Sequence, residues 1–357
     1  MKSALKNFYK NKKVLITGAT GFKGAWLCYW LNILGAKVTG LGHNPNKNKN
    51  LFYLLKLNKK INLKTFDIRD KKKLSKCIQD ASPDVIFHLA AQPLIYESYK
   101  NPFLTYEVNA LGTLNLLECL KNSNNKKIKS VVFVTSDKCY YNNYSTKGFK
   151  EDDKLGGIDP YSGSKACAEI MINTYIQSFF KKNSKIGLAS ARAGNVIGGG
   201  DYSPDRLIPD AIKSILNNKK IYLRNPKFNR PWQHVLEPLY GYLMLGERLY
   251  AKPTKFLGSW NFGTKKNTIT NVEEVVKKII KFWGKGSLKV KKSVKFYEQE
   301  NLQLNISKSE KLLSWSPKLS ITQSVEATAD WYKKVLEKKL CPEKITKDQI
   351  LAYMNID

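Results

Sequence analysis

The segment Lys13–Gly24 reads KVLITGATGFKG, an apolar strand pattern that runs directly into a loop with three glycines. These glycines allow a tight turn and a close approach of the backbone to a diphosphate, and the helix that follows turns its positive N-terminus toward the same group. The spacing is G-x-x-G-x-x-G rather than G-x-G-x-x-G. At a first strand-to-helix junction it predicts a dinucleotide-binding loop made of Gly18, Thr20, Gly21, Phe22, Lys23 and Gly24.

Beyond this loop, strand and helix patterns alternate, and most strands are too apolar to have a solvated face. We therefore predict an α/β fold, a Rossmann-type doubly wound parallel sheet with a smaller, mixed C-terminal substrate domain. The first domain is expected at 1–192, with a returning segment at about 230–262, and the second at 193–357. Strands are expected at 13–17, 37–41, 61–66, 84–89, 131–134 and 186–192, and helices at 22–34, about 71–81, 109–120 and 161–180.

The composition is that of a globular protein, with 42% apolar residues among 357. No apolar run approaches the ~20 residues that cross a membrane, and the first residues lack the apolar stretch of a signal peptide. We therefore expect a cytoplasmic protein. The six cysteines are scattered without a C-x-x-C pair, so we expect buried thiols rather than disulfides or a metal site.

The formal net charge of +32 raises the alternative of a nucleic-acid-binding or redox-sensing Rossmann protein. Lysine, however, makes up 55 of the 61 basic residues and is spread along the whole chain, which is typical of a solvated surface. Five of the six arginines fall within 57 residues, 192–248, which indicates sites that need a planar fork for phosphate or carboxylate. We expect no nucleic-acid partner.

A tyrosine and a lysine four residues apart share one helix face, where the ammonium can lower the pKa of the phenol and make it a usable base. The pattern occurs at Tyr9/Lys13, Tyr96/Lys100 and Tyr161/Lys165. Tyr9 precedes the fold, and Tyr96 lies in the loop that leaves the fourth strand. Only Tyr161 opens a long helix after the fifth strand, so Tyr161 and Lys165 are predicted to be catalytic.

The fifth strand ends in an unusual polar cluster, because residues 131–141 read VVFVTSDKCYY. Ser136, with Thr135 near it, is placed to orient a substrate hydroxyl beside Tyr161. Asp137 and Lys138 follow at once and form a second pair of groups able to move protons. A solvated loop at the end of a strand is the alternative interpretation.

The order of the glycine loop, HLAAQ at 88–92, a hydroxyl after the fifth strand and Y-x-x-x-K resembles the extended short-chain dehydrogenase/reductase family. FKGAWL, AAQPL, ESYKNP, TSDKCY, DPYSGSKACAE, ARAGNVIGGGD, DRLIPD and RPWQHVLEPL are similar to its CDP-glucose 4,6-dehydratase subgroup, over about residues 12–320. The resemblance implies a retained NAD, a sugar nucleotide held between the domains, and a homodimer or dimer of dimers formed by the helices near Asn109 and Tyr161. NAD contacts are expected, besides the glycine loop and the Tyr161–Lys165 pair, from Asp67, Ile68, Leu89, Ala90, Ala91 and Asn109.

The end of the second strand distinguishes only weakly between an NAD site and an NADP site. The second strand ends in Gly42-His43-Asn44, with no acidic residue for a ribose hydroxyl and no arginine for a 2′-phosphate. Asp67, after the third strand, is a candidate for holding the adenine or for capping a helix.

A 4,6-dehydratase explains the polar cluster chemically. Oxidation at C4 of a hexose acidifies the C5 hydrogen, water then leaves across C5 and C6, and hydride returns to C6. Tyr161, Ser136 and Lys165 serve the first step. The elimination needs a further acid and base, for which we assign Asp137 as donor to the leaving hydroxyl and Lys138 as acceptor at C5 or as a charged stabiliser of the enolate.

The expected substrate is CDP-D-glucose, converted to CDP-4-dehydro-6-deoxy-D-glucose for deoxysugar and surface polysaccharide synthesis. The Asp-Lys pair also resembles the C5-inverting UDP-N-acetylhexosamine dehydratases, and a sugar-nucleotide 4-epimerase is a further alternative. Glu237 and His88 are interpreted as structural, and Trp232 as either packing or cleft. The substrate-binding candidates are Gln92, Asn195, Arg206, Arg230 and His234, the last with a core position as an equal alternative.

Overall fold

The computed structural model describes residues 2–43, 50–141, 148–181, 185–265, 270–290 and 302–356. Its centre is a seven-stranded sheet in the order β11-β6-β5-β4-β1-β2-β3, and all neighbouring pairs run parallel. Asn44, at the predicted end of the second strand, lies outside the described residues. The strands are β1 (Lys13–Thr17), β2 (Lys37–Gly42), β3 (Asn62–Thr65), β4 (Val85–His88), β5 (Ser130–Val134), β6 (Gly187–Ala193) and β11 (Gly258–Phe262).

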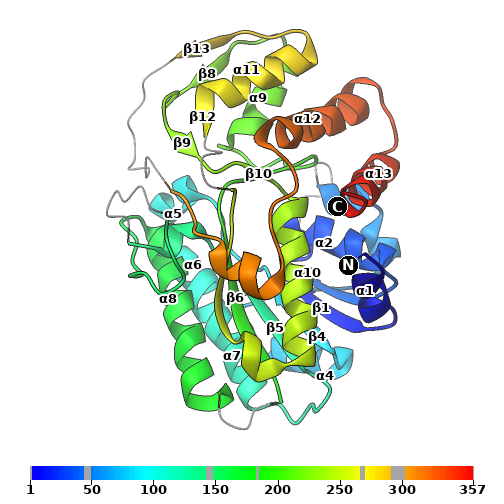
Figure 1. Cartoon of the computed structure of the whole chain (residues 1–357), viewed down its shortest axis with the longest axis vertical. Helices are drawn as coiled ribbons and strands as arrows, with labels where there is room; N and C mark the ends of the chain where they lie inside the picture. Colours follow the sequence, from blue (N-terminus) through cyan, green and yellow to red (C-terminus); the bar gives the residue numbers. More distant parts are fainter. Residues whose placement is uncertain are drawn as a thin grey trace.

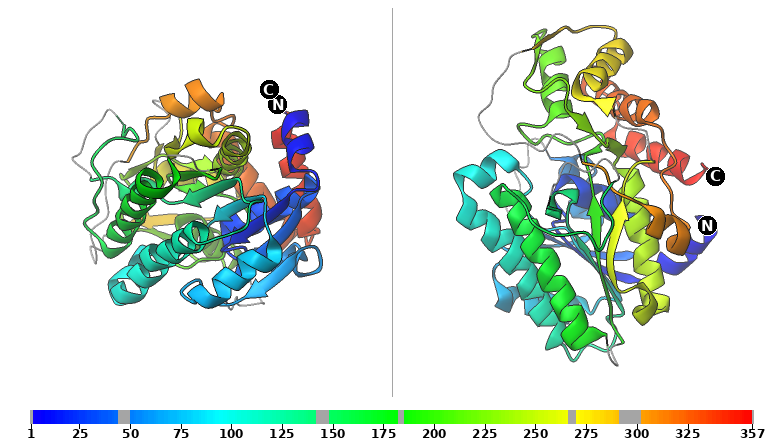
Figure 2. Two further views of the ribbon diagram at one scale, coloured as in Figure 1. Left: turned by 90° about the horizontal axis from the view of Figure 1, so that it is seen from below. Right: turned by 60° about the vertical axis from the view of Figure 1, so that its left-hand side comes forward.

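Helices cover both faces of this sheet, as the view from below shows (Figure 2). One face carries α1 (Lys2–Tyr9), α2 (Phe22–Ile33) and α10 (Leu236–Ala251), and the other carries α4 (Lys71–Ala81), α7 (Gly112–Lys121) and α8 (Pro160–Tyr175). Strands β4, β5 and β6 are buried along their whole length. These strands can therefore be continuously apolar, and the predicted doubly wound α/β fold is confirmed.

The predicted elements of this half lie within a few residues of the observed ones. Two of the predicted helices contain a π-helical turn, η3 (Glu107–Leu111) before α7 and η5 (Ile176–Phe180) after α8. The remaining short elements here are α3 (Leu51–Leu54), η2 (Leu57–Lys59), α5 (Ile95–Lys100), α6 (Pro102–Tyr106), η4 (Asp137–Cys139) and η6 (Pro253–Phe256).

A smaller unit lies above the carboxyl ends of the strands (Figure 1). It uses short paired strands, in which β8 pairs with β13, β9 with β12, and β7 with β10. The elements that follow β6 outside the large sheet are β7 (Val196–Ile197), α9 (Leu207–Leu216), β8 (Ile221–Leu223), β9 (Asn229–Arg230), β10 (Gln233–His234), β12 (Thr270–Asn271), α11 (Val272–Trp283), β13 (Leu288–Val290), η7 (Ser309–Leu313), α12 (Ile321–Tyr332), η8 (Lys333–Glu337) and α13 (Pro342–Met354).

The chain returns to the large sheet late in the sequence. Helix α10 packs on it, and β11 adds an edge strand beside β6. Both termini lie on the same side of the molecule, where α1 and α13 are near each other (Figure 1). This course supports a boundary near residue 193 with a returning segment, and we keep that division as a proposal.

Among the described residues, no helix has both the length and the apolar character of a membrane span. All six cysteines are free thiols. Cys28, Cys77, Cys119 and Cys139 are buried, but Cys341 is exposed, so the prediction of buried thiols was wrong for that residue. Cys341 precedes α13, near the molecular surface.

Candidate active site

A cleft of about 1180 Å³ runs along the carboxyl ends of the parallel strands and continues under the smaller unit. Its floor contains the residues that follow β1, β4, β5 and β6, where ligands bind in open α/β sheets. Its roof contains residues from α9, β8 and the loops around them. The residues predicted for cofactor, chemistry and substrate therefore meet in one place, with exceptions described below.

The glycine loop forms one end of the cleft, and all six of its predicted residues line it. Gly18 has φ +72°, and a Cβ there would lie 2.6 Å from the backbone of Leu89 and Ala90. A Cβ at Gly24 would lie 2.0 Å from the carbonyl oxygen of Gly18. Side chains would fill the space that a diphosphate and the helix packing require, so the loop fits a dinucleotide. Helix α2 begins here without a side-chain cap, which leaves its first N–H groups available to an anion.

The adenosine end of the cleft is lined by Asp67, Ile68, Leu89, Ala90 and Ala91, as predicted, and also by Arg69. Asp67 accepts a hydrogen bond from Arg69 at 2.8 Å, which lowers the pKa of that carboxyl. Arg69 also contacts Glu107 at 2.7 Å. No arginine stands at the end of β2, where the sequence was expected to mark the choice of cofactor. The carboxyl end of β3 lies at the same edge of the sheet and brings Arg69 there.

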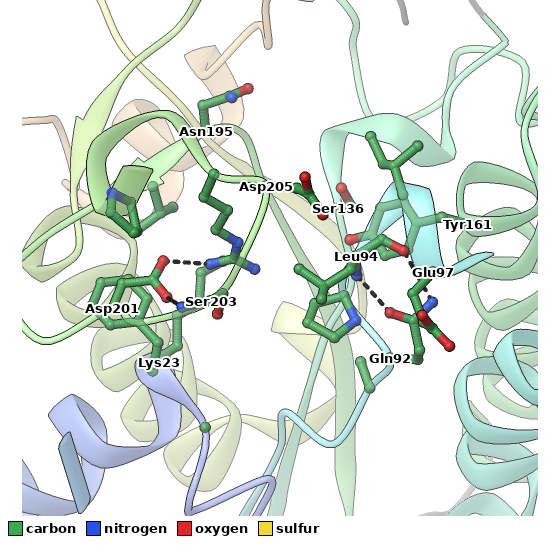
Figure 3. Close-up of a pocket in the computed structure, with 18 of the residues that line it drawn as sticks. Lys23, Gln92, Leu94, Glu97, Ser136, Tyr161, Asn195, Asp201, Ser203 and Asp205 are labelled. Carbon is green, nitrogen blue, oxygen red and sulfur yellow. Dashed lines mark hydrogen bonds and ion pairs between the residues drawn. The ribbon is translucent and has the colours of Figure 1, made fainter. Parts of the chain in front are cut away.

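The polar cluster after β5 also lines the cleft, together with Tyr161 and Lys165 from α8. The hydroxyl of Ser136 donates to Asp137 Oδ1 at 3.1 Å, and its oxygen accepts from the backbone N–H of Lys138 at 3.2 Å. The Ser136 hydroxyl lies close enough to Tyr161 to lower the pKa of its phenol, although burial outweighs this effect. Figure 3 shows Ser136 and Tyr161 together on one side of the cleft, facing Lys23 and Asp201 on the other. The assigned hydroxyl, phenol and acid–base residues therefore share one surface.

Burial dominates the electrostatics of the phenol and the amine. It raises the pKa of Tyr161 to about 12, against the opposing hydrogen bond from Ser136 and the positive charge of Arg206. It lowers the pKa of Lys165 to about 8, although the carboxylate of Glu169 favours the ammonium. The net shift of the Tyr161 pKa is therefore upward, opposite to the predicted lowering, because desolvation of the phenolate outweighs the groups that favour it.

Asp137 is the most unusual group of the cleft. Its side chain is 2% exposed, and Oδ2 has no hydrogen-bond partner among the described residues. Burial raises its pKa, opposed by the charges of Lys138, Arg230 and Lys23. A raised pKa favours the protonated carboxyl, which suits an acid more than a base.

Three of the arginines from 192–248 line the roof of the cleft. Arg206 contacts Asp201 at 2.7 Å, and Arg230 lies near the ring of Phe228 and donates to a backbone carbonyl. Arg224, which the sequence analysis did not select, lies 4.6 Å from the ring of Tyr96 on the opposite wall. Asn195, Gln92 and Trp232 line the same space, with Gln92 held through Leu94 and Thr105.

Two predicted site residues are not brought to the cleft. His234 is fully buried beside Trp26, accepts from the N–H of Leu236, and has a lowered pKa of about 3 because of burial. Asn109 lies behind the wall, where its amide binds the backbone of Gln92 and the hydroxyl of Ser164. His234 therefore belongs to the core, and Asn109 supports the wall rather than contacting a ligand in the cleft.

Thr135 lines the cleft, but its hydroxyl donates to Glu169, which does not, so the hydroxyl is already engaged behind the wall rather than beside Ser136. His88 is a core residue, as predicted, with its ring nitrogens 2.7 and 3.2 Å from the hydroxyls of Thr17 and Thr113. Glu237 is structural, as predicted, because its carboxylate accepts from the backbone of Lys318 and Leu319 and from a buried tyrosine.

A glycine loop on the first strand, a Ser–Tyr–Lys set after the fifth strand and a cleft roofed by a second unit define an extended short-chain dehydrogenase/reductase. Within that class the chain belongs to the GDP-mannose 4,6-dehydratase family, whose model matches residues 15–328.

Comparison with characterised proteins narrows the relationship. The chain is 43% identical over 333 residues to CDP-glucose 4,6-dehydratase of Salmonella typhimurium, and the match covers 92% of each chain. UDP-glucuronic acid 4-epimerase of Bacillus cereus, solved with UDP-glucuronic acid and NAD, is 25% identical with a TM-score of 0.77 and covers 90% of this chain and 99% of that one. The dTDP-glucose 4,6-dehydratase of Bacillus anthracis, solved with NAD, is 25% identical with a TM-score of 0.74 and covers 91% and 97%.

Proposed function

We propose that this protein is an NAD-dependent 4,6-dehydratase that converts CDP-D-glucose to CDP-4-dehydro-6-deoxy-D-glucose. The observation that carries the proposal is the pair Asp137 and Lys138 beside Tyr161 in one cleft. An alcohol dehydrogenase or a 4-epimerase needs only the phenol, its amine and a hydroxyl, whereas loss of water needs a further acid and base. The extensive identity to a CDP-glucose 4,6-dehydratase supports the same reaction.

NAD is the cofactor, and its fit rests on the glycine loop, where Gly18 and Gly24 leave no room for side chains. Asp67 and Ile68 would hold the adenosine, and Lys165 would hold the nicotinamide ribose. When bound, NAD supplies a hydride acceptor for C4, a hydride donor for C6 and a positively charged ring beside the phenol.

The first proton transfer belongs to Tyr161. As a phenolate it receives the proton of the 4-hydroxyl, while Ser136 binds that oxygen and fixes its direction. Because burial alone favours the neutral phenol, the nearby positive charges and the Ser136 hydrogen bond must favour the phenolate during the reaction. Lys165, buried against the same helix face, contributes one such charge when it is protonated.

The elimination belongs to Asp137 and Lys138. With C4 a ketone, the C5 hydrogen is acidic, and Lys138 accepts it or, as an ammonium, stabilises the enolate. Asp137 donates its proton to the 6-hydroxyl, which leaves as water. The raised pKa and the unpartnered Oδ2 of Asp137 support this direction of transfer. Hydride addition at C6 leaves an enolate, which takes a proton back at C5, so the product keeps its 4-keto group. The proton gained by Tyr161 passes to solvent and Asp137 takes one up, which restores both groups.

The roof of the cleft would hold the nucleotide diphosphate. Arg230, Arg206 and Asn195 line the space above the acid–base groups. Guanidinium groups bind diphosphate oxygens in bidentate geometry, and the loops that carry them join the smaller unit to the sheet. Arg224 against Tyr96 would close this space from the side.

Incubation of the purified protein with CDP-, dTDP-, GDP- and UDP-hexoses tests the proposal. We expect a 4-keto-6-deoxy product from CDP-glucose, detected by NMR, with no net consumption of NAD. A product epimerised at C4 and still carrying its 6-hydroxyl would instead identify a 4-epimerase, and absence of any sugar product would contradict the proposed function.

One observation keeps a second candidate, a C5-inverting dehydratase of UDP-N-acetylhexosamines. The residue after Asp137 is a lysine, which resembles that group as well as the CDP-glucose group. The configuration at C5 in the product of the same incubation separates the two reactions.

We also propose a homodimer through α6 and α8. Phe103 and Ile170 are 76% and 54% exposed, and Tyr106, Leu111 and Phe179 are exposed on the same group of helices. Helix α8 packs beside α6 and α7, so these exposed side chains belong to neighbouring helices. Large apolar side chains exposed on neighbouring helices favour association. Light scattering on the native protein and on Ile170→Glu would show a dimer for the first and a monomer for the second.

A cytoplasmic location and a role in deoxysugar and polysaccharide synthesis complete the proposal. Both follow from the proposed substrate and product, and fractionation of the source cells would test the location.

A further inference from the structure

Behind the catalytic groups lies a buried ion pair that does not line the cleft. Glu169 of α8 and Arg192 of β6 are 1% and 2% exposed, and Arg192 Nη2 donates to Glu169 Oε2 at 2.5 Å. The same carboxylate accepts hydrogen bonds from Ser190 at 2.8 Å and Ser259 at 3.1 Å. We call Glu169 and Arg192 the buried anchor. A charged pair taken out of water requires such hydrogen bonds, and removal of one partner leaves the other charge uncompensated.

The buried anchor holds both ends of the segment that carries the acid–base residues. At one end, Thr135 donates its hydroxyl hydrogen to Glu169 Oε1. At the other end, Tyr140 accepts from Arg192 Nη1 at 2.6 Å and donates to Asn261 at 2.8 Å. Between these two residues lie Ser136, Asp137 and Lys138. We call residues 135–140 the acid–base loop.

The backbone of the acid–base loop closes weakly on itself. Its central part is a 3-10 turn of three residues, η4. The two backbone hydrogen bonds that close this turn, Cys139 to Ser136 and Tyr140 to Asp137, are both 3.4 Å long, beyond the usual range of about 2.7–3.2 Å. The Ser136 side chain caps the turn, and Gly156 donates to the carbonyl of Cys139 at 2.9 Å, so the position of the loop depends on these bonds together with its two anchored ends.

The buried anchor also links this loop to α8, the helix that carries the phenol of Tyr161. Glu169 follows Lys165 by four residues and Tyr161 by eight, so all three lie on one face of α8. The charge of Glu169 favours the ammonium form of Lys165. Through one carboxylate, the loop end at Thr135 and the catalytic helix are held at a fixed separation.

We propose that the Glu169–Arg192 pair is a positioning element for the elimination of water, because it keeps Asp137 and Lys138 in place relative to Tyr161 and Lys165. The inference rests on the proposed function. Tyr161 and Lys165 are fixed by α8 itself, and Ser136, which also serves the oxidation, is next to the anchored end of the loop at Thr135, so oxidation at C4 depends less on the pair. Asp137 and Lys138 lie in the middle of a weakly closed turn, so the elimination depends on it more.

The test separates the two half-reactions in the NAD-loaded protein mixed with CDP-glucose. Bound NADH, followed by its absorbance, reports C4 oxidation, and rapid-quench analysis reports loss of water. Tyr140→Phe removes the hydrogen bonds that Tyr140 makes to Arg192 and Asn261 and leaves the Glu169–Arg192 pair in place. For this variant we expect oxidation within about threefold of the native rate and elimination slowed by about tenfold or more, the scale of a lost hydrogen bond on orientation. Bound NADH should then accumulate in the steady state, unlike in the native protein.

Two further variants keep the result decisive. Glu169→Gln leaves the charge of Arg192 uncompensated and removes the carboxylate that favours the ammonium form of Lys165, so it should slow both steps, and elimination the more strongly. Tyr175→Phe removes a hydroxyl on the same helix that contacts Glu118 away from the buried anchor, and it should behave as the native protein. Equal slowing of both steps without NADH accumulation in Tyr140→Phe, or native behaviour of that variant, would overturn the inference. A native protein that forms no 4-keto sugar would overturn the proposed function instead.

Discussion

The two walls of the cleft are built in different ways. The floor consists of the carboxyl ends of strands in a seven-stranded parallel sheet, and the acid–base residues stand on it. The roof consists of loops and of strands two or three residues long, and it carries Arg206, Arg224 and Arg230. Groups that move protons must be held closely, whereas groups that bind a nucleotide can sit on loops. We infer that chemistry resides on the floor and recognition on the roof.

The largest effect should come from the phenol on the floor. We expect Tyr161→Phe to lower turnover by about 10³–10⁴-fold, because it removes the group that exchanges a proton with the 4-hydroxyl. Bound NADH should not form after CDP-glucose is added, while NAD should remain bound. Tyr175→Phe on the same helix, whose hydroxyl contacts Glu118 away from the cleft, is the matched control. Formation of NADH by Tyr161→Phe at the native rate would place the base elsewhere.

The second prediction separates the residues of the floor that serve C4 oxidation from those that serve elimination. Lys138→Ala should lower product formation by about 10²–10³-fold, the scale of a lost proton-transfer group, while leaving C4 oxidation measurable. NADH should appear on the protein and persist, because oxidation no longer leads to elimination. Lys154→Ala, whose ammonium lies over the ring of Tyr141, serves as control. Full turnover by Lys138→Ala would refute its role.

The sequence allowed the floor to be predicted better than the roof, for a physical reason. In a parallel sheet, every residue that follows a strand reaches the same edge, so Gly18, Leu89, Ser136 and Asn195 had to meet once the strands were located. The apolar runs of these strands and the glycine loop are local signals that need no knowledge of the rest of the fold.

The predictions of site residues that were wrong concerned the directions in which single side chains point. His234 and Arg230 lie four residues apart in the roof, yet one faces Trp26 in the core and the other faces the cleft. Thr135 turns its hydroxyl toward Glu169, and Asn109 sits on a π-helical turn that directs it behind the wall. No pattern in the sequence marks these directions, because they depend on partners distant in the chain.

The third prediction concerns the roof. We expect Arg230→Met to raise KM for CDP-glucose by about thirtyfold, about 2 kcal/mol of a charge-assisted hydrogen bond, with kcat changed much less. The reason is that a diphosphate contact is equally strong before and during the reaction. Arg248→Met, at an exposed position of α10, is the control. A fall in kcat with unchanged KM would move Arg230 from recognition to chemistry.

The fourth prediction uses pH. Asp137 must be protonated to donate, and burial raises its pKa above the ordinary carboxyl value. The elimination rate should therefore be full below that raised pKa and fall as pH rises through it, by about tenfold per pH unit at the steepest. Single-turnover decay of bound NADH across pH measures this limb. Asp137→Asn should be slow and should lack the limb, and a limb that survives in this variant would assign it to another group.

The fifth prediction has the smallest expected effect, and it compares the stability of the roof with that of the floor. Asn271 caps helix α11 in the smaller unit, and its side chain accepts from the N–H of Glu274 at 2.8 Å. Asn271→Ala should cost about 1 kcal/mol of unfolding free energy, the usual value of such a cap. If the roof opens independently of the sheet, hydrogen exchange will increase in α11 and its neighbours and remain unchanged in β4 and β5. Equal acceleration of exchange in the sheet would show that floor and roof unfold as one unit.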